Sequence, residues 1–284
     1  MEQTVHLTAS DGYTLGATLF DAAPHVEIPR AAVLCPGGGV PARVYRHFAA
    51  WLAARGLPVL TFDYRGIGRS RPADARGFDA TSEDWAEDCG TAIAWLRRTY
   101  PRAELIGIAH SFGGLLLGGA PDAVQLARFL LVGVHTGYHG DYHPRWRWPM
   151  TLVWHGAMPA LARLFGYFPG RALRLGENLP AGFARQWAAR RTPHFDTRDP
   201  RTAALVARLG APRGPALALT FTDDGFATAR GTRRVLEQHL TGVAAEHRII
   251  APADVGLKQI GHFGFFRPSA EQALWRPTAD WLLE

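Results

Sequence analysis

Residues 105–114 consist of Leu-Ile-Gly-Ile-Ala-His-Ser-Phe-Gly-Gly, and three leucines follow them at 115–117. The first four residues form an apolar run typical of a buried strand, and the leucines begin a helix-like pattern. A strand that turns sharply into a helix leaves the turn residue at the carboxyl edge of a sheet, near the N–H groups and dipole that favour negative charge at a helix N-terminus. The stretch therefore predicts that Ser111 is exposed there as a nucleophile, although a buried strand-turn-helix with a chance serine has the same pattern.

The composition predicts one large globular α/β domain. The chain has 284 residues, of which 47% are apolar and 20% charged, so it can bury a large core and disorder is not expected. The formal charge is +6, but the arginines are scattered and Lys258 is the only lysine. We therefore expect no nucleic-acid partner, and because Lys258 follows Leu257 rather than a glycine, the sequence contains no phosphate-binding GKS/GKT loop.

Cysteine usage and the N-terminal residues bear on location. Cys35 ends an apolar run and Cys89 falls in a helical pattern, so both are predicted to be buried thiols rather than parts of a disulfide framework. No secretion signal is recognisable after Met1, and no apolar run reaches the roughly 18 residues of a membrane span. These features predict a cytoplasmic protein without a membrane span.

Strand and helix patterns alternate along most of the chain, which predicts an α/β fold with a mostly parallel, twisted sheet and helices on both faces. Ser10-Asp11-Gly12 marks a hairpin turn between the first two strands, and Pro277 is expected to kink or split the last helix. The predicted strands are 3–9, 13–21, 31–35, 58–62, 128–135, 215–221 and 246–251, and the predicted helices are 44–55, 83–100, 199–209, 228–240 and a last helix from after Pro268 to 283. One further strand and the helix that follows it together occupy 103–120.

The alternation is interrupted after residue 136. Residues 137–196 show no buried-strand pattern and are rich in aromatic, histidine, proline and arginine residues. We interpret 1–136 and 197–284 as the core and 137–196 as an aromatic-rich lid inserted at the carboxyl edge of the sheet, because long insertions of this kind usually carry function. The aromatic side chains could equally form a small second core under the lid.

Polar residues that could activate a serine follow two of the later strands. Asp223 and Asp224 come directly after the strand 215–221, and His262 lies between glycines in the loop after the last strand. A serine hydroxyl needs a base to accept its proton, and the base needs an acid to fix its tautomer. These residues can therefore meet Ser111 at one edge of the sheet, although an acid that caps a turn or a histidine satisfied within its loop would have the same pattern.

In combination, these motifs resemble those of the α/β-hydrolase superfamily. Residues 109–113 resemble its G-x-S-x-G nucleophile elbow, with Ala109 in place of the first glycine, and the order Ser, Asp, His is the order of its catalytic triad. The stretch from Asp63 to Ser70 resembles the family's D-x-R-G-x-G-x-S turn, whose role there is mainly architectural. The insertion and the residues 261–267 look similar to a subgroup of uncharacterised predicted bacterial serine α/β-hydrolases.

The resemblance implies an α/β-hydrolase fold and a role for each site residue. Ser111 would be the nucleophile, His262 the general base and Asp224 the acid, with Asp223 as the second choice because Asp224 matches the family's turn better. In the family, the residue after the nucleophile and a glycine of the loop after the third strand donate to the oxyanion. The corresponding donors are the backbone N–H groups of Phe112 and Gly38, with the neighbouring Gly39 as the alternative.

Three histidines and an aspartate raise the question of a metal site. His135, His139 and His143, near Asp141, are spaced by four residues, which aligns ligands only on a helix. Gly137, Gly140 and Pro144 argue against a helix there, so we expect surface or pocket histidines, no metal and no cofactor.

The sequence predicts a serine hydrolase that cleaves a carboxylic ester or related acyl bond of a small molecule, with an apolar or aromatic acyl group under the lid. An acyltransferase or thioesterase with the same triad is one alternative. A non-catalytic binding protein with this fold is another. Neither the substrate nor the oligomeric state is specified by the sequence.

Overall fold

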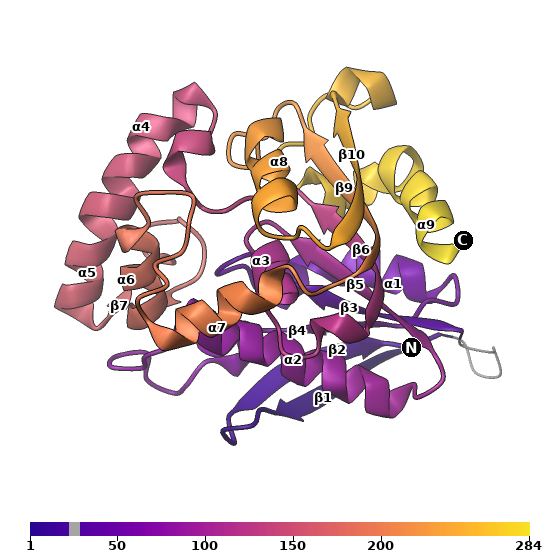
Figure 1. Ribbon diagram of the computed structural model, residues 1–284, viewed down its shortest axis with the longest axis horizontal. Coiled ribbons are helices and arrows are strands. Elements are labelled where there is room, and N and C mark those ends of the chain that lie inside the picture. Colours follow the sequence, from indigo (N-terminus) through magenta and orange to yellow (C-terminus); the bar gives the residue numbers. More distant parts are fainter. Residues whose placement is uncertain (23–28) are drawn as a thin grey trace.

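A computed structural model of the chain describes residues 1–22 and 29–284, and its centre is an eight-stranded sheet (Figure 1). The sheet order is β1-β2-β4-β3-β5-β6-β9-β10. β1 and β2 are antiparallel, β2 is antiparallel to β4, and all pairs from β4 to β10 are parallel. The strands are β1 (Glu2–Thr8), β2 (Thr14–Phe20), β3 (Arg30–Cys35), β4 (Val59–Phe62), β5 (Glu104–His110), β6 (Leu126–Val132), β9 (Gly214–Phe221) and β10 (Val243–Ile250).

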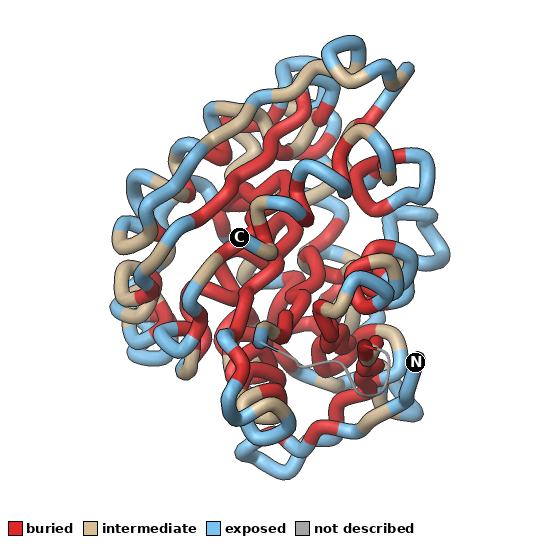
Figure 2. The backbone as a smooth tube through the Cα atoms, turned by 90° about the vertical axis from the view of Figure 1, so that its right-hand side faces the viewer, coloured by how far each residue is buried: buried red, intermediate tan, exposed pale blue. Residues whose placement is uncertain are grey.

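Helices cover both faces of the sheet, as the alternation of elements predicts. Successive side chains of a strand point to opposite faces, so Leu105 and Ala109 of β5 lie in one core cluster, whereas Ile106 and Ile108 lie in the other. The buried residues run through the middle of the molecule (Figure 2). The first cluster is covered by α2 (Ser82–Thr99), α3 (Gly113–Gly118), α7 (Pro200–Leu209) and α8 (Ala229–Gln238), and the second by α1 (Arg46–Ala53) and α9 (Arg276–Leu283).

Two predicted strand boundaries are wrong by a few residues. The strand expected over 128–135 occupies Leu126–Val132, because the chain turns out of the ladder at Gly133, where φ is +56°. The strand expected over 246–251 begins at Val243. Cys35 and Cys89 are both buried free thiols, as predicted, with their Sγ atoms 3.2 Å apart.

In two helical segments, a π-helical turn precedes a proline. The last helix is divided into a π-helical turn, Glu271–Trp275, and α9, which has Pro277 in its first turn. Another π-helical turn, Val153–Ala157, precedes Pro159 in the insertion. A proline ring clashes with the carbonyl four residues earlier and offers no N–H, so a widened turn before the proline lets the chain continue as a helix.

Residues 137–196 form a helical layer beside the sheet, on the left in Figure 1. Four buried side chains, Met158, Ala162, Phe168 and Ala184, give it a small core of its own. Between 137 and 196 the structure contains no strand longer than two residues, in agreement with the predicted lack of buried strands. Its elements are α4 (Pro144–Leu152), α5 (Met158–Phe165), β7 (Tyr167–Phe168), β8 (Leu179–Pro180) and α6 (Ala181–Ala189).

The stretch from Asp63 to Ser70 holds the end of β4 against neighbouring elements. Ser70 accepts a hydrogen bond from Gly16 N of β2 and donates one to the Asp63 carbonyl. Arg65 is buried and donates from its Nε (2.9 Å) and Nη2 (2.6 Å) to one carboxylate oxygen of Asp88, whose other oxygen accepts from Arg65 N. The turn therefore joins the sheet to α2 through a buried ion pair.

We expect Arg65→Met to lower the free energy of unfolding by about 3–5 kcal/mol, because it leaves the fully buried Asp88 carboxylate without its cation. Urea denaturation at pH 7 measures the loss. Arg98→Met is the control, since Arg98 is exposed on α2, the helix that carries Asp88. This control substitution should change the free energy of unfolding by less than about 0.5 kcal/mol. Equal losses in the two variants would contradict a structural role for the Arg65–Asp88 pair.

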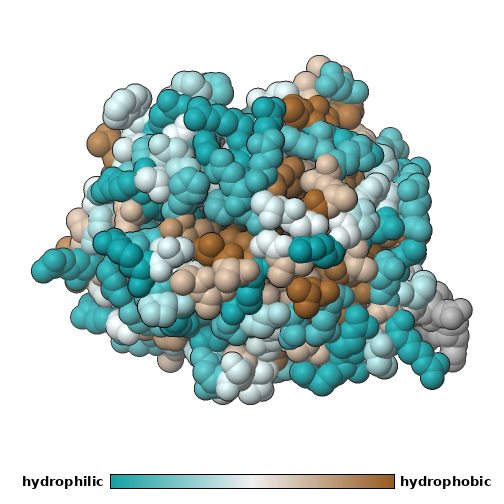
Figure 3. Space-filling view, viewed as in Figure 1, coloured by the Kyte–Doolittle hydropathy of each residue, from teal (hydrophilic) through white to brown (hydrophobic). Residues whose placement is uncertain are grey.

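The face of the molecule seen in Figure 3 is mostly hydrophilic, with apolar residues in separate groups among polar ones. Within residues 1–22 and 29–284, no helix has both the length and the apolar character that a membrane crossing requires.

Candidate active site

Ser111 stands on a sharp turn between β5 and α3. Its φ of +57° is a left-handed conformation that, among the described residues, only one other non-glycine residue adopts. The following glycines permit this turn, since a Cβ at Gly113 would lie 2.2 Å from the Pro36 carbonyl oxygen and one at Gly114 would lie 2.7 Å from Val134. Ala109 lies earlier, in the ladder beside Cys35 of β3, where its methyl group is fully buried without displacing the backbone. The local sequence thus projects one hydroxyl from a rigid, crowded turn.

The structure brings Ser111, His262 and Asp224 together. His262 Nε2 lies 3.0 Å from Ser111 Oγ, and His262 Nδ1 lies 2.7 Å from Asp224 Oδ2. The other oxygen of Asp224 accepts hydrogen bonds from the backbone N–H groups of Phe226 and Ala227, so one carboxylate both caps its own turn and reaches the histidine. This geometry can move a proton from the serine to the imidazole and stabilise the charge that results.

Asp223 lies elsewhere. Its carboxylate oxygens accept hydrogen bonds from Ile260 N and Gly261 N, both at 2.9 Å, at the start of the loop that carries His262. The two neighbouring aspartates therefore have different partners. Asp224 forms a hydrogen bond with the His262 ring, whereas Asp223 accepts hydrogen bonds from the backbone of the loop that carries His262.

The pKa of Asp224 shows the charge that the site favours. Burial by itself would raise this pKa, but the charge of His262, its hydrogen bond and the two backbone N–H donors outweigh burial and lower the pKa to about 2. Asp224 is therefore ionised at neutral pH.

This depressed pKa predicts a pH-dependent contribution to stability. A carboxyl whose pKa is lower in the folded than in the unfolded state stabilises the fold above its unfolded pKa, near 4, and loses that effect as the pH falls toward about 2. The stability difference between wild type and Asp224→Asn should shrink by about 1 kcal/mol between pH 5 and pH 3, out of about 2 kcal/mol in total. Urea denaturation at both pH values tests this, and a constant difference would contradict the assignment.

Backbone N–H groups suited to an oxyanion line the same site. Within the described residues, the N–H groups of Phe112, Gly38 and Gly39 make no hydrogen bond to other protein atoms. The neighbouring Gly37 N donates instead to the Tyr45 hydroxyl, which fixes the loop. Phe112 N–H and the glycine N–H groups are therefore free to donate to a charge that develops on a substrate oxygen.

A second histidine, His135, contacts the Ser111 hydroxyl, and the sequence analysis assigns it no role there. His135 Nε2 lies 3.0 Å from Ser111 Oγ, on the chain just beyond β6. The signal was present, because β6 is the strand beside β5 and a residue just past its carboxyl end can reach the elbow. The spacing of His135 with His139 and His143 is instead the spacing of metal ligands on a helix.

His110 was also missed, and it ties three loops of the site together. Its Nδ1 lies 2.9 Å from the Tyr45 hydroxyl and its Nε2 lies 2.9 Å from the His262 carbonyl. The His262 carbonyl can only accept, so His110 Nε2 carries the proton and donates to it. Nδ1 of the neutral ring then accepts from the Tyr45 hydroxyl, which itself accepts from Gly37 N. Burial and the nearby charge of His262 lower the pKa of His110 well below its usual value, which keeps this neutral arrangement.

His139 and His143, which share the four-residue spacing of His135, make hydrogen bonds away from Ser111 and from each other. His139 Nδ1 lies 2.9 Å from His155 Nε2, and His143 accepts from Arg145 N at the start of α4. In the part of the chain that the structure describes, no group of three or more His, Cys, Asp or Glu side chains could hold a metal ion. Asp141 pairs with Arg230 and Arg234 of α8.

A cavity of about 330 Å³ lies beside Ser111 and His262. Gly38, Gly39 and Phe112 line it. Eight apolar or aromatic side chains of residues 137–196 line it as well: Tyr142, Trp154, Met158, Phe168, Leu175, Leu179, Phe183 and Trp187. The cavity therefore offers a small, mostly apolar space directly at Ser111.

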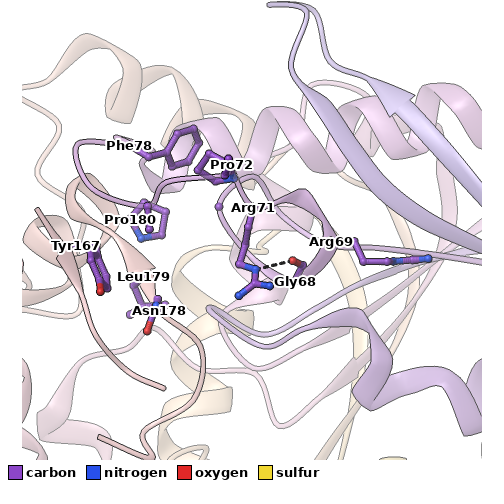
Figure 4. A pocket seen from close by; sticks show the side chains of 12 residues that line it. Gly68, Arg69, Arg71, Pro72, Phe78, Tyr167, Asn178, Leu179 and Pro180 are labelled. Atoms are coloured by element: carbon purple, nitrogen blue, oxygen red, sulfur yellow. Dashed lines mark hydrogen bonds between the residues drawn. The ribbon is translucent and has the colours of Figure 1, made fainter. Parts of the chain in front are cut away.

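A larger cavity of about 630 Å³ adjoins it but does not contain the reactive groups. Its wall is formed by the segment from Gly66 to Phe78 and by Tyr167, Asn178 and Pro180 (Figure 4). Leu179 lines both cavities, and its side chain occupies the space over Gly39. We therefore take the smaller cavity as the site of chemistry.

Comparison with known proteins supports the fold. A family model described as serine aminopeptidase, S33, matches residues 27–158. A monoglyceride lipase from Saccharomyces cerevisiae is similar in structure, with a TM-score of 0.69 at 16% identity over 99% of this chain and 94% of that one. The α/β-hydrolase GrgF from Penicillium sp. sh18 gives 0.64 at 20% identity over 99% and 98%, and an enol-lactonase from Burkholderia xenovorans LB400 gives 0.60 at 18% over 99% and 100%.

Proposed function

The chain has the fold of the α/β-hydrolase superfamily, and from this premise we propose that it is a serine hydrolase that cleaves a carboxylic ester or a related acyl bond. The observation that carries the proposal is the unbroken chain of hydrogen bonds from Asp224 Oδ2 through His262 to Ser111 Oγ, at 2.7 and 3.0 Å. A serine becomes a useful nucleophile only when such a base and its orienting acid are in place.

In the proposed reaction, Ser111 Oγ attacks the acyl carbon while His262 Nε2 accepts the hydroxyl proton. Asp224 keeps the proton on His262 Nδ1 and stabilises the imidazolium. The N–H groups of Phe112 and Gly38, or Gly39, donate to the oxyanion. His262 then protonates the leaving group, and water, activated by the same histidine, releases the acyl group from Ser111.

We propose that residues 137–196 act as a lid over the acyl group. The support is that aromatic and apolar residues of this segment line the cavity at Ser111, and that two of them, Met158 and Phe168, also belong to its small internal core. A cavity of about 330 Å³ suits a small acyl or aromatic group rather than a long lipid chain. The segment thus serves both purposes that its composition allowed.

A panel of p-nitrophenyl esters with acyl chains from two to sixteen carbons tests the substrate class. We expect kcat/KM to be highest for short and medium chains and to fall for long ones, because the cavity at Ser111 has a volume of only about 330 Å³. A rising kcat/KM up to sixteen carbons would contradict the assigned cavity. Product analysis with added alcohol or thiol acceptors distinguishes hydrolysis from acyl transfer, and thioester substrates test a thioesterase.

A further inference from the structure

His135 has a defined protonation pattern because both of its ring nitrogens have partners. Its Nδ1 lies 2.9 Å from the backbone N–H of Gly137, which can only donate, so Nδ1 is the acceptor. The proton of the neutral ring is then on Nε2, 3.0 Å from Ser111 Oγ. His135 therefore donates a hydrogen bond to the serine oxygen.

The two histidines at Ser111 consequently have opposite roles. His262 Nδ1 faces the ionised Asp224 and carries a proton, so its Nε2 accepts the serine proton. The serine has one proton to donate, which goes to His262, and its oxygen lone pairs accept from His135. The hydrogen bonds of Ser111, His135 and His262 are all satisfied by only one assignment of donors and acceptors. In that assignment His135 Nε2 already carries a proton, so His135 cannot be the base.

The surroundings of His135 keep it a neutral donor. The ring is buried between Tyr142 and Trp187, with centroid distances of 5.8 and 6.4 Å. Burial, followed by the charge of His262, lowers the pKa of His135 to about 3. The ring thus stays uncharged when the neighbouring His262 gains a proton during the reaction.

We propose that His135 is a catalytic donor that stabilises Ser111 Oγ as the leaving group when the acyl-enzyme breaks down. The inference rests on the proposed serine hydrolase function. In deacylation, water adds to the acyl carbon and gives a proton to His262 Nε2. The C–Oγ bond then breaks, Oγ keeps the electron pair and takes the proton back from His262, and His135 contributes a hydrogen bond while it keeps its own proton.

This donor favours deacylation over acylation for a physical reason. The ester oxygen of an acyl-enzyme is a weak acceptor, so its hydrogen bond to His135 strengthens as the oxygen gains charge on leaving, and only interactions that strengthen in the transition state accelerate a step. The free hydroxyl already accepts well from His135 before it attacks. The same hydrogen bond is therefore present at the start of acylation and accelerates it little.

Two substitutions distinguish the two hydrogen bonds of His135. One bond is donated by Nε2 to Ser111 Oγ, and the other is accepted by Nδ1 from Gly137 N and closes a local turn. The Oδ1 atom of His135→Asn can replace Nδ1 as the acceptor for Gly137 N–H, but the side chain is too short to reach Ser111 Oγ. The amide nitrogen of His135→Gln can take the place of Nε2 and donate to Oγ, but it leaves Gly137 N–H without that acceptor. His139→Asn is the control, since His139 pairs with His155 away from the serine.

Stopped-flow kinetics with p-nitrophenyl acetate measure the burst, which reports acylation, and the following steady state, which reports deacylation. We expect His135→Asn to slow deacylation about tenfold with acylation within threefold of wild type, and His135→Gln to restore deacylation to within about threefold. His139→Asn should change neither rate.

The opposite ranking, with the glutamine variant impaired and the asparagine variant normal, would show that His135 only closes the turn and would overturn the inference. Equal deacylation rates in all variants would do the same. If the wild type forms no acyl-enzyme at Ser111, the proposed function itself fails, so the two failures are distinguishable.

Discussion

Ser111→Ala should lower kcat for any ester substrate by about 10⁶-fold, to the level that oxyanion donors and binding alone support. The reason is that the Ser111 hydroxyl, held at φ +57°, lies 3.0 Å from two histidines, and alanine removes this hydroxyl while it keeps a side chain of similar size on the turn. Steady-state hydrolysis of p-nitrophenyl acetate measures the loss.

Ser10→Ala is the matched control, since Ser10 is an exposed serine in the turn between β1 and β2, and it should retain wild-type kcat. If Ser111→Ala keeps more than about one hundredth of wild-type activity, Ser111 is not the nucleophile.

Asp224→Asn should lower kcat by about 10³–10⁴-fold. The Asn oxygen can still accept from Phe226 N and Ala227 N, so its NH₂ group faces His262 Nδ1 and drives the ring proton to Nε2. His262 can then no longer accept the proton of Ser111. The measured quantity is kcat at the pH optimum of the wild type.

Asp223→Asn is the matched comparison, because it makes the same chemical change at the neighbouring aspartate. Its side chain would lose one of two hydrogen bonds to the loop of His262, at Ile260 N or Gly261 N, and we expect a loss of about tenfold or less. A larger loss for Asp223→Asn than for Asp224→Asn would mean that the acid of the site has been wrongly assigned.

Much of the fold could be predicted because short stretches of the sequence are enough to indicate most strands, helices and their ends. Apolar runs such as 105–108 alternate with helical stripes, and glycine, proline and capping residues end them. Strand ends were predicted less well, since β6 ends where Gly133 takes a positive φ, which residue patterns do not specify. The internal packing of 137–196 could not be predicted, because it depends on contacts of α5 and α6 with each other and with β7 that residue spacing does not specify.

The candidate site was predictable where chain order and strand ends decide it. Ser111, Asp224 and His262 each follow a strand at the carboxyl edge, so their meeting follows from the parallel sheet. His135 follows β6 at the same edge, but its part depends on a hydrogen bond from Gly137 N that fixes one tautomer. Such a direction of donation is a property of three-dimensional neighbours and has no signature in residue spacing.

The central claim is that Ser111 is an activated nucleophile, and active-site labelling tests it most directly. The native protein is incubated with a fluorophosphonate probe, digested, and the modified peptide is located by mass spectrometry. We predict a single stoichiometric adduct on Ser111, absent from Ser111→Ala and retained in Ser10→Ala. No labelling of the wild type, under conditions that label a control serine hydrolase, would contradict the claim and favour a non-catalytic binding protein.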